Sequence, residues 1–200
     1  MKVLGRGWQY TTYDLGNGRV LKKYNSSFVG CWVIFRDFLT YGSPMPWRIL
    51  GSFQDCREKA LVSIQKVING PLDPWMIGTP KILNELDYEQ DKLTPLHSLI
   101  SKAEVEEGKR LVDEFVGLNK TLVERGLIDK NFNITQNFGL DSKGRVVLMD
   151  LGELYSDRVS IDEQQRKRMW ANAHVAKVFS NKEAHSYYVE QMDKNFGSVN

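Results

Sequence analysis

The sequence predicts an α+β fold in two lobes, a β-rich N-terminal lobe followed by a reduced, mainly helical C-terminal lobe. Residues 2–25 are rich in strand-forming side chains and contain Asn17-Gly18, a strong hairpin signal. Residues 103–125 carry apolar side chains at helical spacing. A second hairpin pattern, at 137–149, lies within this helical half. Strands that come first and helices that follow are typical of the α+β class.

The first half should hold several strands and two helices. Trp8, Tyr10 and Thr12 alternate with Gln9, Thr11 and Tyr13 in the first β-rich run. Further strands are expected at 19–24, 81–83 and 86–93. A helix is expected at 28–41, broken by Pro44 and Pro46, and another at 55–68, ended by Asn69-Gly70-Pro71.

The second half should consist of helices with a single β-hairpin between them along the chain. The helix at 103–125 ends at Gly126, and the hairpin pairs 137–141 with 145–149. Two more helices are expected at 162–179 and 182–196. We therefore expect residues 1–200 to form one domain, with an N-lobe at about 1–93, a hinge at about 94–97 and a C-lobe at about 98–200.

Composition excludes several classes of protein. The formal net charge is +2 and both signs are mixed along the chain, which gives no case for a nucleic-acid or membrane partner. Cys31 and Cys56 form neither a metal spacing nor a disulfide framework. No apolar signal core opens the sequence. These features predict a cytoplasmic protein, or alternatively an effector secreted into a host cell, which would have a similar composition.

The hairpin at 137–149 carries the clearest chemical pattern. Asn137 stands at the head of its first strand, and Asp150 follows its second. A tight hairpin brings those two ends together. An amide oxygen beside a carboxylate suits a hard divalent cation such as Mg²⁺, and Gly152 allows a sharp turn after the carboxylate. A plain surface hairpin with polar ends is the alternative interpretation.

This segment resembles the metal-binding hairpin of protein kinases. The thirteen-residue step from Asn137 to Asp150 matches the family's spacing, and "GRVVLMDLGEL" is similar to the strand before its Asp-Phe-Gly motif, with Leu151 in place of Phe. The resemblance implies that Asn137 and Asp150 hold Mg²⁺ or Mn²⁺ against the phosphates of ATP.

The resemblance extends over residues 4–155 and covers the start of the chain. Leu4-Gly5-Arg6-Gly7 is similar to the family's glycine-rich loop, which implies that Gly5 and Gly7 approach the phosphates, although Tyr10 occupies the third glycine position. The family's phosphate-binding lysine corresponds to Lys22 or Lys23. Lys22 is favoured because it shares a strand face with Val20, which would line the adenine pocket.

Three further residues of the nucleotide site follow from the resemblance. Kinases pair the strand lysine with a helix glutamate, and Glu58 is the one glutamate between Lys22 and Asn84. Gln90 and Lys92 lie in the segment that would pass between the lobes and bind adenine. A surface position is the alternative for Glu58.

The catalytic aspartate of the family has no direct counterpart. Its usual position, five residues before the metal-binding Asn, is Phe132. Asp129 is the nearest upstream carboxylate, and it would serve as the base if the loop holds three extra residues. Asn133 could orient a hydroxyl group.

The resemblance therefore implies a minimal kinase of the atypical bacterial or effector type. The expected activity is ATP-dependent phosphoryl transfer to a protein hydroxyl, by an atypical protein kinase. The alternative is a pseudokinase that binds ATP and regulates a partner protein. A small-molecule kinase is a third hypothesis, but the acidic catalytic loop of that class is not visible in the sequence.

Overall fold

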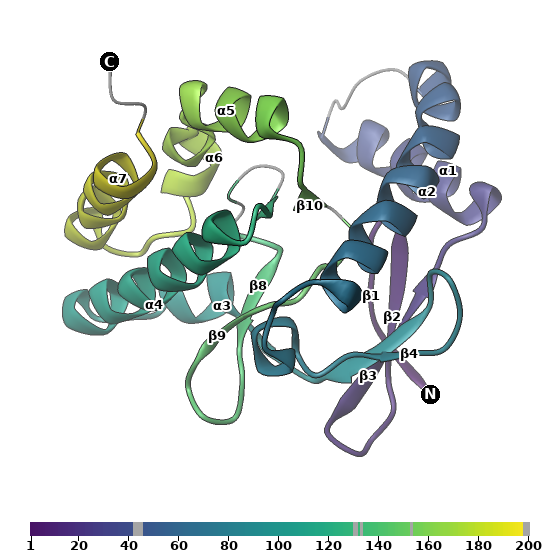
Figure 1. Cartoon of the computed structure of the whole chain (residues 1–200), viewed down its shortest axis with the longest axis horizontal. Helices are drawn as coiled ribbons and strands as arrows, with labels where there is room; N and C mark the ends of the chain where they lie inside the picture. The colour runs from purple at the N-terminus through teal and green to yellow at the C-terminus, as the bar shows by residue number, and fades with distance from the viewer. Residues whose placement is uncertain (42–45, 130–131, 133, 153, 198–200) are drawn as a thin grey trace.

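The chain forms an N-terminal lobe built on an antiparallel sheet and a C-terminal lobe dominated by helices (Figure 1). This computed structural model describes residues 1–41, 46–129, 132, 134–152 and 154–197. The α+β fold class and the order of the two lobes are as the sequence predicts.

The N-terminal sheet has five strands in the order β1-β2-β3-β5-β4. The strands are β1 (Lys2–Arg6), β2 (Tyr10–Asp14), β3 (Arg19–Tyr24), β4 (Lys81–Ile82) and β5 (Tyr88–Asp91). The hairpin between β2 and β3 contains Gly16 and Gly18, both at φ 77°, where glycine is favoured. Trp8 and Gln9 were expected in a strand, but they form a turn in which the Gly7 amide donates to the Tyr10 carbonyl over 2.8 Å.

Two helices, α1 (Ser27–Tyr41) and α2 (Pro46–Asn69), follow β3. The second helix begins nine residues before the expected start at Asp55, because a proline at the first helical position costs no hydrogen bond. Pro44 lies outside the described residues. Ala60, Ile64 and Val67 of α2 belong to the buried core, so this helix fixes one side of the N-terminal lobe.

The C-terminal lobe joins several helices to two small sheets. After the single turn η1 (Pro74–Ile77) of the first lobe, its elements are β6 (Thr94–Pro95), α3 (Leu96–Ile100), α4 (Val105–Glu124), β7 (Ile128–Asp129), β8 (Phe138–Leu140), β9 (Val146–Leu148), β10 (Leu154–Tyr155), α5 (Arg158–Arg166), η2 (Met169–Ala171), α6 (Ala173–Ala176) and α7 (Lys182–Phe196). Strand order is β6-β8-β9 in one sheet, and β7 pairs with β10 in the other.

The prediction of a single helix at 162–179 is wrong. It is divided into α5, η2 and α6, with Arg168 in the left-handed region at φ 47°. The Arg168 guanidinium and the Trp170 indole both donate hydrogen bonds to Asp193 of α7. The chain leaves the helix because this arrangement places Trp170 fully inside the core.

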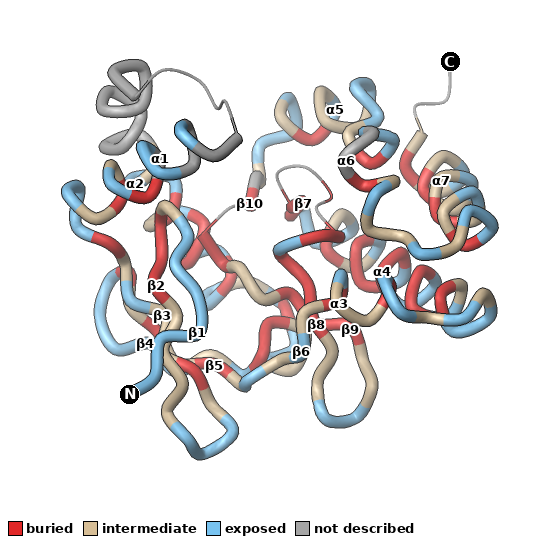
Figure 2. The backbone as a smooth tube through the Cα atoms, turned by 180° about the vertical axis from the view of Figure 1, so that it is seen from behind, coloured by how far each residue is buried: buried red, intermediate tan, exposed pale blue. Residues whose placement is uncertain are grey.

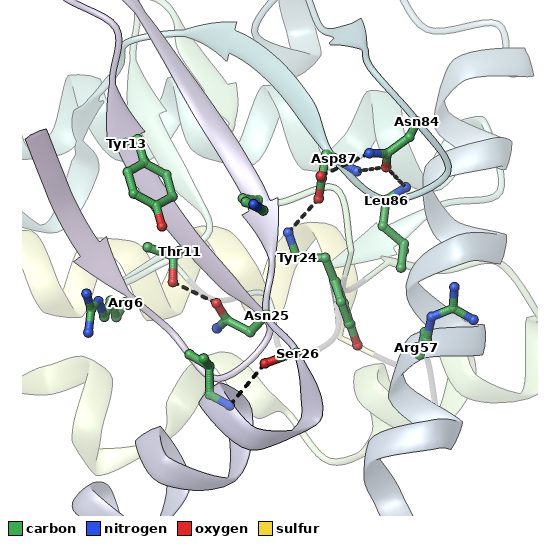
Figure 3. Close-up of a pocket in the computed structure, with 12 residues that line it drawn as sticks. Arg6, Thr11, Tyr13, Tyr24, Asn25, Ser26, Arg57, Asn84, Leu86 and Asp87 are labelled. Carbon is green, nitrogen blue, oxygen red and sulfur yellow. Dashed lines mark hydrogen bonds between the residues drawn. The ribbon is translucent and has the colours of Figure 1, made fainter. Parts of the chain in front are cut away.

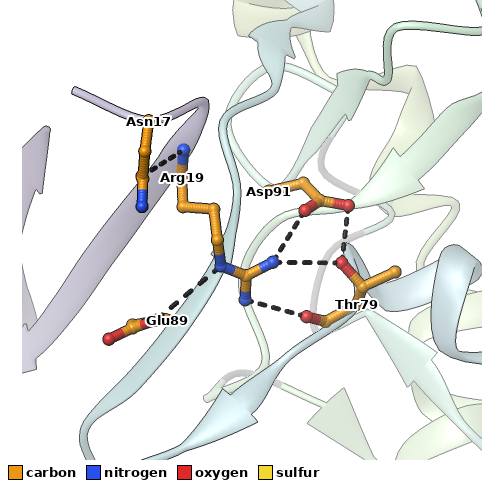
Figure 4. A network of polar contacts seen from close by, with 5 residues as sticks. All are labelled: Asn17, Arg19, Thr79, Glu89 and Asp91. Carbon is orange, nitrogen blue, oxygen red and sulfur yellow. Dashed lines mark hydrogen bonds and ion pairs between the residues drawn. The ribbon is translucent and has the colours of Figure 1, made fainter. Parts of the chain in front are cut away.

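Residues 92–93 join β5 to β6, directly before the hinge expected at about 94–97, and are called the crossing below. Figure 4 shows the Arg19 guanidinium of β3 bound to the end of β5 and to the segment before β4: Nη1 lies 2.8 Å from Asp91 Oδ1, and Nη2 donates to the Thr79 carbonyl over 3.0 Å. Lys92 Nζ lies 2.6 Å from Asp14 Oδ2, a contact that lowers the pKa of Asp14. The ion pair between Lys92 and Asp14 therefore connects the crossing to the hairpin between β2 and β3.

Buried residues run through both lobes and the junction between them (Figure 2). Phe115 of α4 stacks edge-on against Phe138 of β8, with 4.8 Å between ring centroids, and contacts Tyr188 of α7 at 6.1 Å. These contacts hold the hairpin that carries Asn137 and Asp150 on the helical lobe. Within the described ranges, no helix is long and apolar enough to span a bilayer.

Candidate functional site

A small cavity of about 150 Å³ brings together side chains from both lobes. Its N-terminal side consists of the turn at 7–10 together with Thr12 and Lys22, and its C-terminal side of Gln136, Asn137 and Asp150. Three residues singled out in the sequence as a phosphate lysine and two metal ligands thus line one space, although 115 positions separate Lys22 from Asn137.

The strand register decides which lysine faces this cavity. Lys22 lies opposite Thr12 of β2, and both line the cavity, whereas Lys23 lies opposite Thr11 on the other face of the sheet. Val20 shares the face of Lys22 and is buried, as alternation along a strand requires. Among the described residues, no hydrogen bond or ion pair occupies the Lys22 ammonium.

Asn137 is held by a buried carboxylate behind it. The Asn137 amide nitrogen donates to Asp129 Oδ1 over 2.5 Å, and the two residues are 4% and 0% exposed. Asp129 is placed by the pairing of β7 with β10, where it lies opposite Leu154. Because the amide nitrogen faces Asp129, the amide oxygen is the group that Asn137 can offer elsewhere.

Asp150 follows β9 and is half-buried at the cavity wall. Its Oδ1 accepts a hydrogen bond of 3.1 Å from the Gly152 amide. The next residue, Leu151, is fixed by the first lobe: Ser63 of α2 donates to its carbonyl over 2.5 Å, and its amide donates to the Tyr88 hydroxyl over 3.3 Å. The backbone beside Asp150 is therefore positioned by α2 and β5.

The turn at 7–10 packs directly on the segment that carries Asp150. A Cβ atom added at Gly152 would lie 3.0 Å from Tyr10 Cε2 and 3.3 Å from Gln9 Oε1, so a larger residue would push the turn outward. Burial, followed by the nearby Asp150 charge, raises the pKa of the Tyr10 hydroxyl, so this group stays neutral at physiological pH.

Asn25, just after β3, holds the turn from the other side. Its backbone amide donates to the Gln9 carbonyl over 2.7 Å. Its side-chain amide donates to the carbonyls of Gly7 over 2.8 Å and Trp8 over 3.2 Å. Three consecutive carbonyls of the turn are thereby bound to one residue.

The site can hold a divalent cation only together with a ligand. Asp150 contributes one carboxylate and Asn137 one amide oxygen, and no cluster of three acidic, cysteine or histidine ligands occurs among the described residues. Mg²⁺ characteristically binds one or two protein carboxylates and completes its shell with phosphate oxygens and water. The donor set therefore fits a cation that arrives with a phosphate group.

Several residues that the sequence pointed to do not line this cavity. Gly5 lies in β1, in register with Thr12, and Gln90 is buried beside Gly78. Lys92 is paired with Asp14. Asn133 lies outside the described residues.

Glu58 is exposed on α2, and no described contact joins it to Lys22. It lies five positions before Ser63, which faces Leu151, and is therefore about 140° away round the helix. The ion pair between Lys22 and Glu58 that the resemblance implies is therefore not present in this structure.

Phe132, at the position where kinases carry their aspartate, is a core residue. It is 0% exposed, and its ring packs against Trp170 and Phe196 at centroid distances of 5.3 and 4.9 Å. Its φ is 47°, a conformation rare for a bulky residue. The Phe132 side chain is a hydrocarbon ring with no group that can accept a proton, and the aromatic contacts place it in the core.

The residues in or beside the site that were not predicted from the sequence include Thr12, Gln136, Ser63 and Tyr88, and also Trp8 and Gln9 of the turn. Thr12 could have been found from alternation, because it pairs with Lys22 on the same face. Gln136 directly precedes Asn137. The contacts of Ser63 and Tyr88 with Leu151 join residues 88 and 63 positions apart, and no local signal in the sequence indicates them.

No family model matches the chain, and no curated protein matches it. Solved structures with a similar fold include the complex of Rv3197 with erythromycin from Mycobacterium tuberculosis, at 13% identity and a TM-score of 0.49, covering 96% of this chain and 53% of that one. Another is the bifunctional kinase-methyltransferase WbdD, at 12% identity and a TM-score of 0.48, covering 96% of this chain and 44% of that one. The chain spans about half the length of each. Similarity at this level leaves the activity to be argued from the residues of the site.

Proposed function

We propose that this chain binds ATP with a divalent cation between its lobes and transfers the γ-phosphoryl group to a hydroxyl, as protein-kinase-like enzymes do. The observation that carries the proposal is the convergence of Lys22, Asn137 and Asp150 on one cavity beneath the turn at 7–10. A lysine, an amide oxygen and a carboxylate are the groups that phosphoryl transfer requires for holding phosphates and their metal.

Each cavity residue has a distinct part in this proposal. The Lys22 ammonium, which has no competing partner among the described residues, binds phosphate oxygens. Asp150 and the Asn137 amide oxygen hold Mg²⁺ or Mn²⁺, which neutralises charge on the phosphates when it is bound. Asp129 fixes the orientation of the Asn137 amide.

The size of the cavity sets a requirement on binding. Sites for drug-sized ligands usually measure about 300–1,000 Å³. The 150 Å³ found here admits a metal and phosphate groups rather than a whole nucleotide. Binding of ATP therefore requires the nucleoside to lie outside this cavity or the turn at 7–10 to move away from Gly152.

The acceptor that we propose is a protein hydroxyl, and Asp129 is the proposed base. Asp129 is the first carboxylate upstream of the metal-ligand Asn137, and it touches that residue directly. In structures without substrate, catalytic contacts are often incomplete and tighten only in the reacting complex. The buried position of Asp129 is therefore compatible with this role once the acceptor binds.

A pseudokinase that binds ATP and regulates a partner protein is the second candidate. It is favoured by Phe132, because a phenylalanine at the usual aspartate position of kinases offers no proton acceptor. Both candidates require the same nucleotide site, and they differ in phosphate transfer alone.

Two measurements test the proposal in order. Mg²⁺ and ATP together should raise the melting temperature more than either alone, because a ligand at a hundred times its Kd stabilises the native state by about 2.7 kcal/mol. Transfer of radiolabelled γ-phosphate to a protein mixture would then identify an enzyme, whereas binding without transfer would identify the pseudokinase. Absence of any metal-dependent shift would refute both.

Lys22→Ala should weaken ATP binding far more than Lys23→Ala. Only Lys22 reaches the cavity, and a charge-assisted hydrogen bond is worth about 1.5–3 kcal/mol, or roughly 10- to 100-fold in Kd. Calorimetric titration of both variants with Mg·ATP measures the difference. The reverse ranking would mean that the phosphates lie on the other face of the sheet.

A further inference from the structure

A second pocket, of about 570 Å³, lies on the opposite face of the N-terminal sheet (Figure 3). Its walls come from β1, β2, β3, the start of α1, the middle of α2 and the turn before β5. Three cationic side chains line it, Arg6, Lys23 and Arg57, and Figure 3 shows Arg6 and Arg57 on opposite sides.

Strand register places two of these cations in one row. Arg6 of β1 lies opposite Thr11 of β2, and Thr11 lies opposite Lys23 of β3. Residues directly opposite one another in antiparallel strands point to the same face, and neighbouring strands lie about 4.8 Å apart. Arg6 and Lys23 thus stand on either side of Thr11, close enough for their long side chains to bind one anion.

These cations are poorly neutralised by the protein itself. Among the described residues, neither Arg6 nor Lys23 forms an ion pair. Arg57 pairs with Glu85 at 3.6 Å between two exposed side chains, and such pairs contribute little.

Asp87 is the one carboxylate among the described residues that line the pocket, and both of its oxygens accept hydrogen bonds from the protein. Asp87 Oδ1 accepts from the Tyr24 amide over 2.7 Å, and Oδ2 accepts from the Asn84 side chain over 3.0 Å. Asp87 therefore binds the backbone of β3. Three cationic side chains and one carboxylate line the pocket, so its net charge is positive.

The remaining wall suits an organic group. Leu86 is buried, and Tyr24 and Val29 are half-buried in the same pocket. The Thr11 hydroxyl donates to Asn25 Oδ1 over 2.6 Å, so these two polar side chains are hydrogen-bonded to each other. A volume of 570 Å³ lies in the range of small-molecule sites.

From this arrangement we infer a binding site for a small organic phosphate, with the phosphate between Arg6 and Lys23 and the organic group toward Tyr24 and Leu86. A phosphate monoester carries up to two charges at neutral pH and three acceptor oxygens, which matches two long cationic donors in one row. The third cation, Arg57, lies at the far side of the pocket. The site is separate from the cavity of Lys22 and does not depend on the function proposed for it.

Phenyl phosphate is a suitable probe because it combines the two required parts. Calorimetric titration should show one site, with binding that is tighter than that of inorganic phosphate or phenol and weaker at high salt. Arg6→Gln and Lys23→Gln should each weaken it roughly tenfold or more, as expected for a lost charge-assisted hydrogen bond. Lys120→Gln, on the exposed face of α4, is the matched charge control and should bind normally.

Amide chemical shifts locate the probe. Resonances of Thr11 and Asn25 should move with phenyl phosphate, and the same shifts should appear in Asp150→Ala, whose change lies in the other cavity. Circular dichroism verifies that the Arg6 and Lys23 variants fold. The inference is overturned if no binding occurs, if phenol binds equally well, if the Lys120 control loses as much affinity, or if Lys22→Ala abolishes binding while the Arg6 and Lys23 variants retain it.

Discussion

Replacement of Asp150 by alanine is expected to abolish metal-dependent ATP binding while the fold persists. Asp150 is the one carboxylate among the described residues that line the cavity, so its loss removes the charged ligand that a divalent cation needs. Its side chain accepts a hydrogen bond from the Gly152 amide, two residues further along the chain, so the packing of the two lobes loses little by its removal. Titration with ATP, with and without Mg²⁺, measures the loss, and circular dichroism verifies the fold.

Asp150→Asn is the matched control for shape. Its amide oxygen can still accept the hydrogen bond from Gly152, but the negative charge is gone. We expect it to lose the Mg²⁺ dependence as the alanine variant does. If folded Asp150→Ala kept the full Mg²⁺-dependent affinity, the cavity would not be a metal site.

Asp129→Asn is expected to lower phosphate transfer by roughly 10²–10⁴-fold, the usual contribution of a general base. ATP affinity should change little, because asparagine can still accept the hydrogen bond from Asn137 through its own amide oxygen. Single-turnover transfer and equilibrium binding, measured on the same preparation, separate the two effects.

Asp129→Ala distinguishes a base from a residue that only positions Asn137. Alanine removes the acceptor and leaves a buried amide donor unsatisfied, so it should impair ATP binding and stability as well as transfer. Near-normal transfer by Asp129→Asn, together with damage in Asp129→Ala, would assign Asp129 to positioning alone. The protein would then transfer phosphate without a general base.

The parts of the site that depend on local geometry could be predicted from the sequence. The register of β3 follows from alternation, which alone places Lys22 on the face of Val20. Likewise Asn137 and Asp150 come together because a short hairpin joins them. The helix expected at 182–196 is present as α7 with the same bounds.

Long-range contacts could not be predicted in this way. The position of Glu58 depends on how α2 is rotated against the segment after Asp150. The hydrogen bonds from Ser63 and Tyr88 to Leu151 fix that rotation. The break at Arg168 depends on Asp193, which lies 25 residues further along the chain. The burial of Asp129 against Asn137 depends on the pairing of β7 with β10, two strands of two residues each, which are too short to show a pattern.

The three bonds from Asn25 to the turn have a consequence for the opposite side of that turn. A trans peptide is planar, so the N–H that follows a carbonyl points away from it. Because the Gly7 and Trp8 carbonyls face the Asn25 side chain, the N–H vectors of Trp8 and Gln9 are directed away from Asn25. Asn25 lines the second pocket, that of Arg6 and Lys23, whereas the turn itself lines the cavity of Asp150. One asparagine outside the cavity thus sets the direction of two backbone dipoles at its rim.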